Sequence, residues 1–264
     1  MKNVLLLIHN DAGQEARLQA ALDLIRALSG HLHCLDVTPM PLVAELVWGS
    51  PALVYDESES EERNAAAITA RLRGEDVAWT LDEVRGEYAA CLADAARTAD
   101  VVVLNRRLDK FPGPHMPALA GELLHRSEAL ILAVAEGGHG LDVCAPAVVG
   151  WDGSETVMHA LRRAMPLLLK ASAVVMFQAG EAPDGAIPIE EGAAYLSRHG
   201  VKPEIQLSAD AANPAAQIAS AAERLCAGYC LVGGFGHSRL REAIFGGVTR
   251  ELLETAGMPL LIGH

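Results

Sequence analysis

Aromatic residues and long apolar runs are both scarce in this sequence. Phe, Trp and Tyr together make up 4% of the 264 residues, which argues against a platform of rings that stacks the bases of a single-stranded nucleic acid. Although 51% of the residues are hydrophobic, no apolar run approaches the roughly 20 residues needed to span a bilayer. We therefore expect neither a single-strand-binding protein nor a membrane protein.

Positive charge is also in short supply. Lys and Arg number 21 against 34 Asp and Glu, a net charge of −13, so the overall field repels nucleic acids and anionic membrane surfaces. A local phosphate site stays compatible with this charge, because backbone N–H groups act at short range. A strand-like run begins at residue 4, without the basic and apolar segments of a secretory leader. We expect a cytoplasmic protein.

Cysteine is too sparse and too irregular for a disulfide framework. The five cysteines stand in scattered apolar contexts, as buried reduced thiols do. Cys226-x-x-x-Cys230 and His31-x-His33 are the pairs that could bind a metal. Each pair offers two ligands where a structural zinc site takes four, so we expect no metal site.

Strand-like and helix-like segments alternate along the whole chain. Short apolar strands are predicted at residues 4–8, 31–37, 76–81, 101–104, 130–135, 147–151, 173–177, 202–207, 229–232 and 259–262. Helices are predicted at residues 14–28, 58–73, 88–98, 119–126, 155–170, 189–199, 214–227 and 249–255. Largely apolar strands separated by helices indicate a parallel sheet that is covered on both faces.

The order of elements repeats after a hinge-like segment at residues 136–140. The motif Ala99-Asp-Val-Val-Val-Leu104 corresponds to Ala227-Gly-Tyr-Cys-Leu-Val232. A period as long as a domain indicates duplication rather than a solenoid. We expect two tandem Rossmann-like α/β modules, residues 1–138 and 143–264, each with a five-stranded, mostly parallel sheet and helices on both faces.

A glycine-rich segment follows the strand predicted at residues 229–232. Gly233-x-x-Gly236 is followed after nine residues by Gly246-Gly247, where a helix is expected to begin. Glycines let the backbone approach a ligand closely, and a helix N-terminus offers N–H groups to an anion. A loop at the carboxyl end of a strand lies where open α/β sheets bind nucleotides. The segment is therefore either a phosphate cradle or a tight turn in a scaffold protein.

Asp152 is the second candidate, at the end of the strand predicted at residues 147–151. Its carboxylate could accept hydrogen bonds from a ribose hydroxyl or an adenine amine, while Ser154 suits the cap of the next helix. In the alternative interpretation, Asp152-Gly153 is only a turn.

These segments resemble the universal stress protein family, whose pattern is Gly, two residues, Gly, nine residues, then Gly followed by Ser or Thr. Gly233, Gly236 and Gly246 fall on that spacing, and the resemblance covers the chain as a tandem pair. It implies a stress-response protein that binds ATP or another adenine nucleotide, with or without Mg²⁺, in the second module. The implied site residues are Asp152, Gly233, Gly236, His237, Gly246, Gly247, Val248 and Thr249.

The second module departs from the family pattern at one position. Gly247 stands where the family has Ser or Thr, which removes a hydrogen bond to phosphate that contributes about 0.5–1.5 kcal/mol. His237 and Arg239 either add charge for a phosphate or lie at the solvent or an interface. No Walker lysine follows the glycines, and no base for an attacking water is evident. We expect no enzyme, or at most a slow incidental ATPase.

The first module departs further. Asn105-Arg-Arg-Leu108 stands where the first glycine pair is expected, and Asp11 could take the place of Asp152. We expect this module to be degenerate for ATP. Arg106 and Arg107 either bind another anion or form a solvated surface pair.

Partners follow from the expected edges of the two sheets. The strands at residues 130–135 and 259–262 are predicted to pair, which would give an intramolecular pseudo-dimer and remove two exposed strand edges. A homodimer of the whole chain is a further expectation. The apolar insertion at residues 40–55 is either a lid over a ligand or packing at a dimer interface. The competing function is a scaffold, or a stress protein that binds a small ligand other than a nucleotide.

Overall fold

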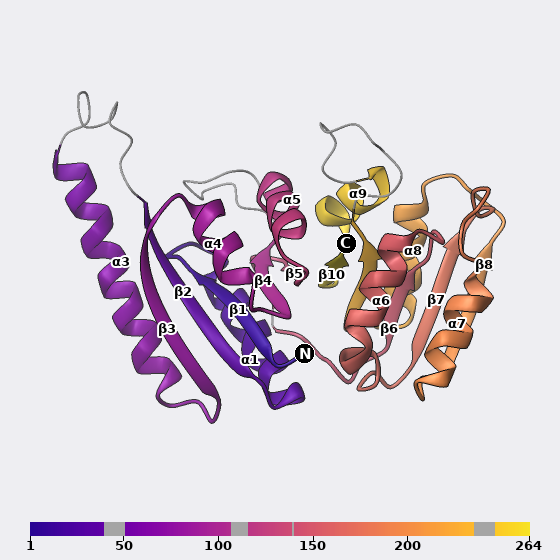
Figure 1. The fold of residues 1–264 in the computed structure, drawn as a ribbon, viewed down its shortest axis with the longest axis horizontal. Coiled ribbons are helices and arrows are strands. Elements are labelled where there is room, and N and C mark those ends of the chain that lie inside the picture. Colours follow the sequence, from indigo (N-terminus) through magenta and orange to yellow (C-terminus); the bar gives the residue numbers. More distant parts are fainter. Residues whose placement is uncertain (40–50, 107–115, 139, 235–245) are drawn as a thin grey trace.

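One ten-stranded sheet runs through the molecule in the order β3-β2-β1-β4-β5-β10-β9-β6-β7-β8 (Figure 1). The computed structural model describes residues 1–39, 51–106, 116–138, 140–234 and 246–264. Residues 3–134 form the first five strands of this order and residues 147–263 form the last five. Within each half the strands are parallel. The two halves have equivalent strand orders, β3-β2-β1-β4-β5 in the first and β8-β7-β6-β9-β10 in the second. The predicted α/β fold class is confirmed.

The elements alternate as the sequence predicts. The strands are β1 (Asn3–Ile8), β2 (His31–Pro39), β3 (Ala78–Gly86), β4 (Val101–Asn105), β5 (Leu130–Val134), β6 (Ala147–Gly150), β7 (Val174–Ala179), β8 (Pro203–Ser208), β9 (Tyr229–Gly233) and β10 (Leu260–Gly263). The helices are α1 (Gln14–Leu28), α3 (Pro51–Leu72), α4 (Tyr88–Ala96), α5 (Met116–Arg126), α6 (Glu155–Leu168), α7 (Ile189–Arg198), α8 (Pro214–Arg224) and α9 (Gly247–Thr255).

Two apolar cores cover the two faces of the sheet. Helices α1, α3, α6 and α7 pack on one face, and α4, α5, α8 and α9 pack on the other. Successive strand residues point to opposite faces, so Leu6 joins the first core while Leu5 and Leu7 join the second. Every residue of β4 and β5 is buried, which explains why these central strands are apolar at every position but one.

The two halves meet where β5 and β10 pair in antiparallel fashion, with Leu132 opposite Leu261. This finding confirms the predicted pairing of the terminal strands. The side chain of Arg106 also crosses the junction and donates a hydrogen bond to the carbonyl of Ala256. A solvated surface role is therefore wrong for Arg106, whereas Arg107 lies outside the described residues.

Helix α3 begins earlier than predicted. It starts at Pro51, whereas the sequence analysis predicts this helix from residue 58. Proline suits the first position of a helix, because its missing N–H has no partner there. Residues 40–50 of the apolar insertion lie outside the described residues, so a lid or interface role stays a prediction. No described helix is long and apolar enough to cross a membrane.

The cysteines bear out one prediction and correct another. All five are free thiols, as expected for reduced cysteines. Cys34 and Cys230 are buried, and burial raises the pKa of each thiol to about 12. Cys144 and Cys226 are exposed, because they lie in connections rather than in strands, so burial is not general among them.

Candidate functional site

The predicted site residues that the structure describes lie where the strand-to-helix connections of the second half turn to opposite faces of the sheet. β6 and β9 are parallel neighbours, with Val149 opposite Leu231. The chain leaves β6 for α6 on one face and leaves the glycine-rich segment after β9 for α9 on the other. Asp152 and Gly233 therefore lie at the same carboxyl edge of the sheet. A crevice at such a topological switch point is the usual ligand site of open α/β sheets.

The carboxylate of Asp152 is fixed by the start of helix α6. Its Oδ1 accepts hydrogen bonds from the backbone N–H of Ser154 at 2.9 Å and from the Ser154 hydroxyl at 2.6 Å. The Ser154 Oγ in turn accepts from the N–H of Val157 at 3.2 Å and so caps α6. Asp152 thus makes the predicted turn, while its side chain stays exposed. Its second oxygen has no hydrogen-bond partner among the described residues and can accept from a ligand.

Gly233 is required by close packing. A Cβ built on this residue would lie 2.9 Å from Thr156 Oγ1 and 3.0 Å from the backbone nitrogen of Val157. Only glycine lets the end of β9 approach the first turn of α6 so closely. The side chain of Thr156, which the sequence analysis does not single out, also lies 2.8 Å from the Ser154 hydroxyl. Its position two residues after a helix cap is the sequence signal that could have identified it.

Thr249 holds the far end of the glycine-rich segment. Its side chain is buried, and its hydroxyl donates to the carbonyl of Gly233 at 2.9 Å. Because a hydroxyl has one proton to donate, a phosphate that used this donor would have to displace the bond. Gly236 and His237 lie outside the described residues.

The first turn of α9 is open around its backbone. Gly246 precedes the helix without a side-chain cap, and a Cβ built on Gly246 or Gly247 would meet no atom of the described residues within 4 Å. Gly247 is exposed, whereas Val248 is half-buried and packs against the core below the helix. The first N–H groups of a helix lack intrahelical partners, so this turn can donate to an anion that approaches the open side.

The equivalent crevice of the first half is filled by Arg17. This residue of α1 is fully buried, and its Nη1 lies 2.9 Å from both carboxylate oxygens of Asp11. The same nitrogen donates to Asn105 Oδ1, and Nη2 donates to the carbonyl of His9 at 3.1 Å. The Asn105 amide also donates to the carbonyl of Gly13 at 3.3 Å. The side chains of Arg17, Asp11 and Asn105 therefore fill the crevice of the first half that corresponds to the predicted nucleotide site of the second half.

Asp11 is consequently a partner of arginine rather than a free acceptor. This arrangement supports the expectation that the first half is degenerate for ATP. The sequence analysis misses Arg17, although a charge on the apolar stripe of α1, between Ala16 and Leu18, is a signal of a buried ion pair.

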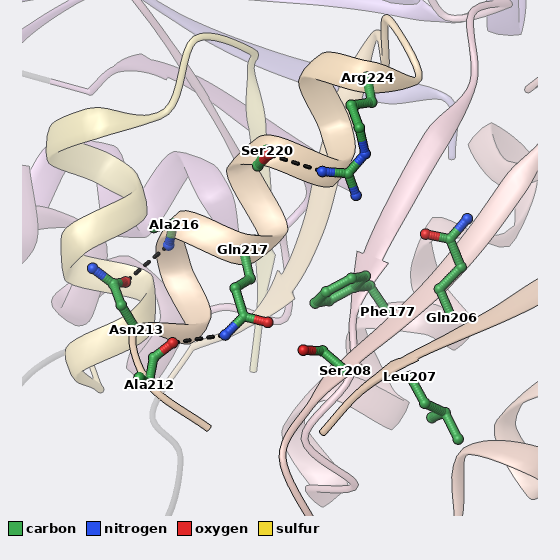
Figure 2. A pocket seen from close by; sticks show the side chains of 10 residues that line it. All are labelled: Phe177, Gln206, Leu207, Ser208, Ala212, Asn213, Ala216, Gln217, Ser220 and Arg224. Carbon is green, nitrogen blue, oxygen red and sulfur yellow. Dashed lines mark hydrogen bonds between the residues drawn. The ribbon is translucent and has the colours of Figure 1, made fainter. Parts of the chain in front are cut away.

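A second hollow lies nearby, between α8 and the edge strand β8 (Figure 2). It has a volume of about 590 Å³, and Phe177 forms part of its wall beside the amide side chain of Gln206. Figure 2 shows Gln217 and Arg224 along the same side of α8; the first donates to the carbonyl of Ala212 at 2.6 Å and the second to Ser220 at 2.9 Å. None of the predicted site residues that the structure describes lines it, so we do not assign the nucleotide to this hollow.

A family model described as the universal stress protein family matches residues 1–133. The match thus falls on the first half, whereas the glycine spacing lies in the second. No protein of curated function matches the chain.

Solved structures resemble the whole chain. A universal stress protein from Archaeoglobus fulgidus DSM 4304 is 13% identical, with 99% of this chain and 95% of that chain covered and a TM-score of 0.76. A putative universal stress protein from Pseudomonas aeruginosa UCBPP-PA14 is 15% identical, with 99% and 92% covered and a TM-score of 0.62. The cytoplasmic domain of a prokaryotic cation chloride cotransporter is 13% identical, with 99% and 94% covered and a TM-score of 0.51. At these identities the likeness concerns the fold alone.

Proposed function

The chain belongs to the universal stress protein family, and on that premise we propose that its second half binds ATP or another adenine nucleotide. One observation carries the proposal: Asp152, Gly233 and the first turn of α9 converge at the β6–β9 switch point. The nucleotide would act as a signal that this cytoplasmic stress-response protein reads out through its conformation or assembly.

The residues present suit the parts of such a ligand. The exposed oxygen of Asp152 would accept from a ribose hydroxyl or the adenine amine, and the N–H groups at the start of α9 would hold phosphate. The surroundings of Gly246 and Gly247 support this assignment, since no atom of the part of the chain that the structure describes lies within 4 Å of a Cβ built there. Any Mg²⁺ would arrive with the phosphates, because no group of three His, Cys, Asp or Glu among the described residues could hold a metal ion.

We propose a binding protein and not an enzyme. Among the described residues of the crevice, Asp152 is engaged with Ser154, and the Thr249 hydroxyl is engaged with Gly233. The second oxygen of Asp152 is assigned above to the nucleoside, so with nucleotide bound neither group would be left to activate water, and hydrolysis would be slow and incidental.

A scaffold without nucleotide is the second candidate. It is favoured by the structural roles of two site residues: Gly233 is required by packing against Thr156, and Asp152 accepts hydrogen bonds from Ser154, which caps α6. These contacts would be retained in a protein that needs only the turn geometry.

The repeated strand order supports a further proposal about organisation. We take residues 1–138 and 143–264 as two domains of the same family, joined through β5 and β10 as an intramolecular pseudo-dimer. A homodimer of the whole chain stays a prediction.

The first test asks whether the protein carries a nucleotide from the cell. Mass spectrometry of the supernatant after denaturing the purified protein should find ATP, ADP or AMP. A ligand at about one hundred times its dissociation constant should also stabilise the native state by about 2.7 kcal/mol, which is measured as a thermal shift with Mg-ATP.

A matched pair of variants locates the site. Asp152→Asn should reduce the Mg-ATP shift. Asp142→Asn should not, although Asp142 makes a similar turn by accepting from the N–H groups of Cys144 and Ala145 at 3.0 and 3.1 Å. Absence of nucleotide from the supernatant together with no shift in the wild type would favour the scaffold.

A further inference from the structure

A cavity of about 710 Å³ lies at the junction of the two halves, where β5 begins and β10 ends. The first half contributes His125 and Arg126 from α5, and the second half contributes Thr156 and His159 from α6 and His264 after β10. The described residues assigned to the nucleotide site above do not line it. The cavity is therefore a feature of the junction and separate from the proposed function.

Basic side chains outnumber acidic ones in the lining of this cavity. Three arginines and three histidines face two glutamates, in a chain whose net charge is −13. Such a local excess of cationic and titratable groups, against the overall field, is typical of a site that attracts anions.

Two of the acidic groups described around the cavity are engaged in ion pairs. Glu128 forms an ion pair with Arg163, and Glu122 lies 3.3 Å from Arg126. Glu155 lies in the first turn of α6, where the helix dipole stabilises a carboxylate.

The remaining arginine, Arg162, lies 5.8 Å from the centre of the Tyr195 ring. The three imidazoles are then the groups that can add positive charge to the cavity as the pH falls.

The three imidazoles lie close enough to influence one another. Burial lowers the pKa of His264, and the charges of His125 and His159 lower it further. An anion among the rings would offset this repulsion and favour the protonated form of His264. A metal is not the matching ligand, since no three metal-binding side chains in the described parts of the chain are grouped to hold one.

We propose that this cavity binds a small, multiply charged anion through His125, His159 and His264, with Arg126 and Arg162 at its sides. The ligand contacts α5 from the first half and α6 from the second, so its binding stabilises the junction. Protonation of the imidazoles strengthens binding, and the affinity therefore rises as the pH falls.

Isothermal titration of the full chain with inorganic pyrophosphate and with citrate tests the proposal. Wild type should bind at least one probe about tenfold more tightly at about pH 6 than at about pH 8. The double variant His125→Gln/His159→Gln should bind about tenfold more weakly at the lower pH and lose the pH dependence. Both replaced side chains are exposed, so the variant is expected to fold, which circular dichroism checks.

A control double variant removes the same number of histidines elsewhere. His31→Gln/His33→Gln, on β2 at a different hollow, should bind like wild type. If both probes bind, the cavity recognises negative charge alone; if only pyrophosphate binds, it recognises phosphate. Either result supports the proposed site. No binding of either probe at the lower pH would overturn it. So would a pyrophosphate signal that Gly247→Ala alters while His125→Gln/His159→Gln leaves it unchanged, because that signal belongs to α9.

Discussion

The hydroxyl of Thr249 donates to the carbonyl of Gly233 across 2.9 Å and ties the first turn of α9 to the end of β9. These residues stand at the two ends of the glycine-rich segment. Thr249 is 5% exposed, so water competes little for the bond. The contact fixes the N-terminus of α9 at the same edge of the sheet as Asp152, and the proposed phosphate donors take their position from it.

Removal of this hydroxyl should destabilise the fold. Thr249→Val keeps the branched shape but leaves the Gly233 carbonyl without its donor, which is expected to lower the free energy of unfolding by about 1–3 kcal/mol. Urea denaturation measures the change. Thr249→Ser, which retains the hydroxyl, is the control and should lose less; equal losses in the two variants would mean that packing and not the hydrogen bond stabilises this site.

Restoring the family hydroxyl at Gly247 should strengthen nucleotide binding. A Cβ at this position meets no atom within 4 Å among residues 1–39, 51–106, 116–138, 140–234 and 246–264, and Gly247→Ser would offer one more donor to phosphate. A hydrogen bond to a charged acceptor corresponds to about a tenfold gain in affinity, measured by titration with Mg-ATP. Gly247→Ala separates this gain from helix stabilisation. If Ala and Ser raise the affinity equally, the hydroxyl makes no contact with the ligand.

The sequence predicts the architecture well because buried strands and amphipathic helices leave periodic signals. Helix α1 occupies residues 14–28 as predicted, and β5 and β10 pair as predicted. Local signals also explain the errors at boundaries. Pro51 begins α3, ahead of the predicted start at residue 58, although proline at a first helical position is a local signal of a helix start.

Contacts between residues that are far apart in the sequence could not be predicted from the spacing of residues along the chain. Arg17 and Asn105 are 88 positions apart, and their contact depends on β1 and β4 being neighbours. The histidines at positions 125, 159 and 264 meet only because β5 and β10 pair at the junction. The order of the strands in the sheet is the step from which such contacts follow.

The buried ion pair of the first half should be costly to break. Arg17→Met leaves Asp11 without its partner, and loss of one member of a buried pair costs about 3–5 kcal/mol. Chemical denaturation measures this, and the double variant Arg17→Met/Asp11→Asn should recover part of the loss. Arg71→Met is the control: it removes the surface partner of Glu15, a residue of α1 like Arg17. This change should lower the free energy of unfolding by about 0–1 kcal/mol. If the double variant recovers no free energy of unfolding, Asp11 is not the charged group that Arg17→Met leaves without a partner.

Asp100 should make the fold sensitive to acid. Burial opposes ionisation of its carboxylate, but the N–H groups of Asn3 and Lys2, at 2.9 and 2.6 Å, outweigh burial and lower its pKa. A lowered pKa in the folded state contributes stability above the ordinary value, about pH 4, and this stability is lost as the pH falls through the lowered value. Urea midpoints measured from about pH 7 down to about pH 3 should therefore fall more steeply for wild type than for Asp100→Asn. The exposed Asp184→Asn is the control and should follow wild type; parallel curves for wild type and Asp100→Asn would mean that Asp100 contributes nothing to the acid response.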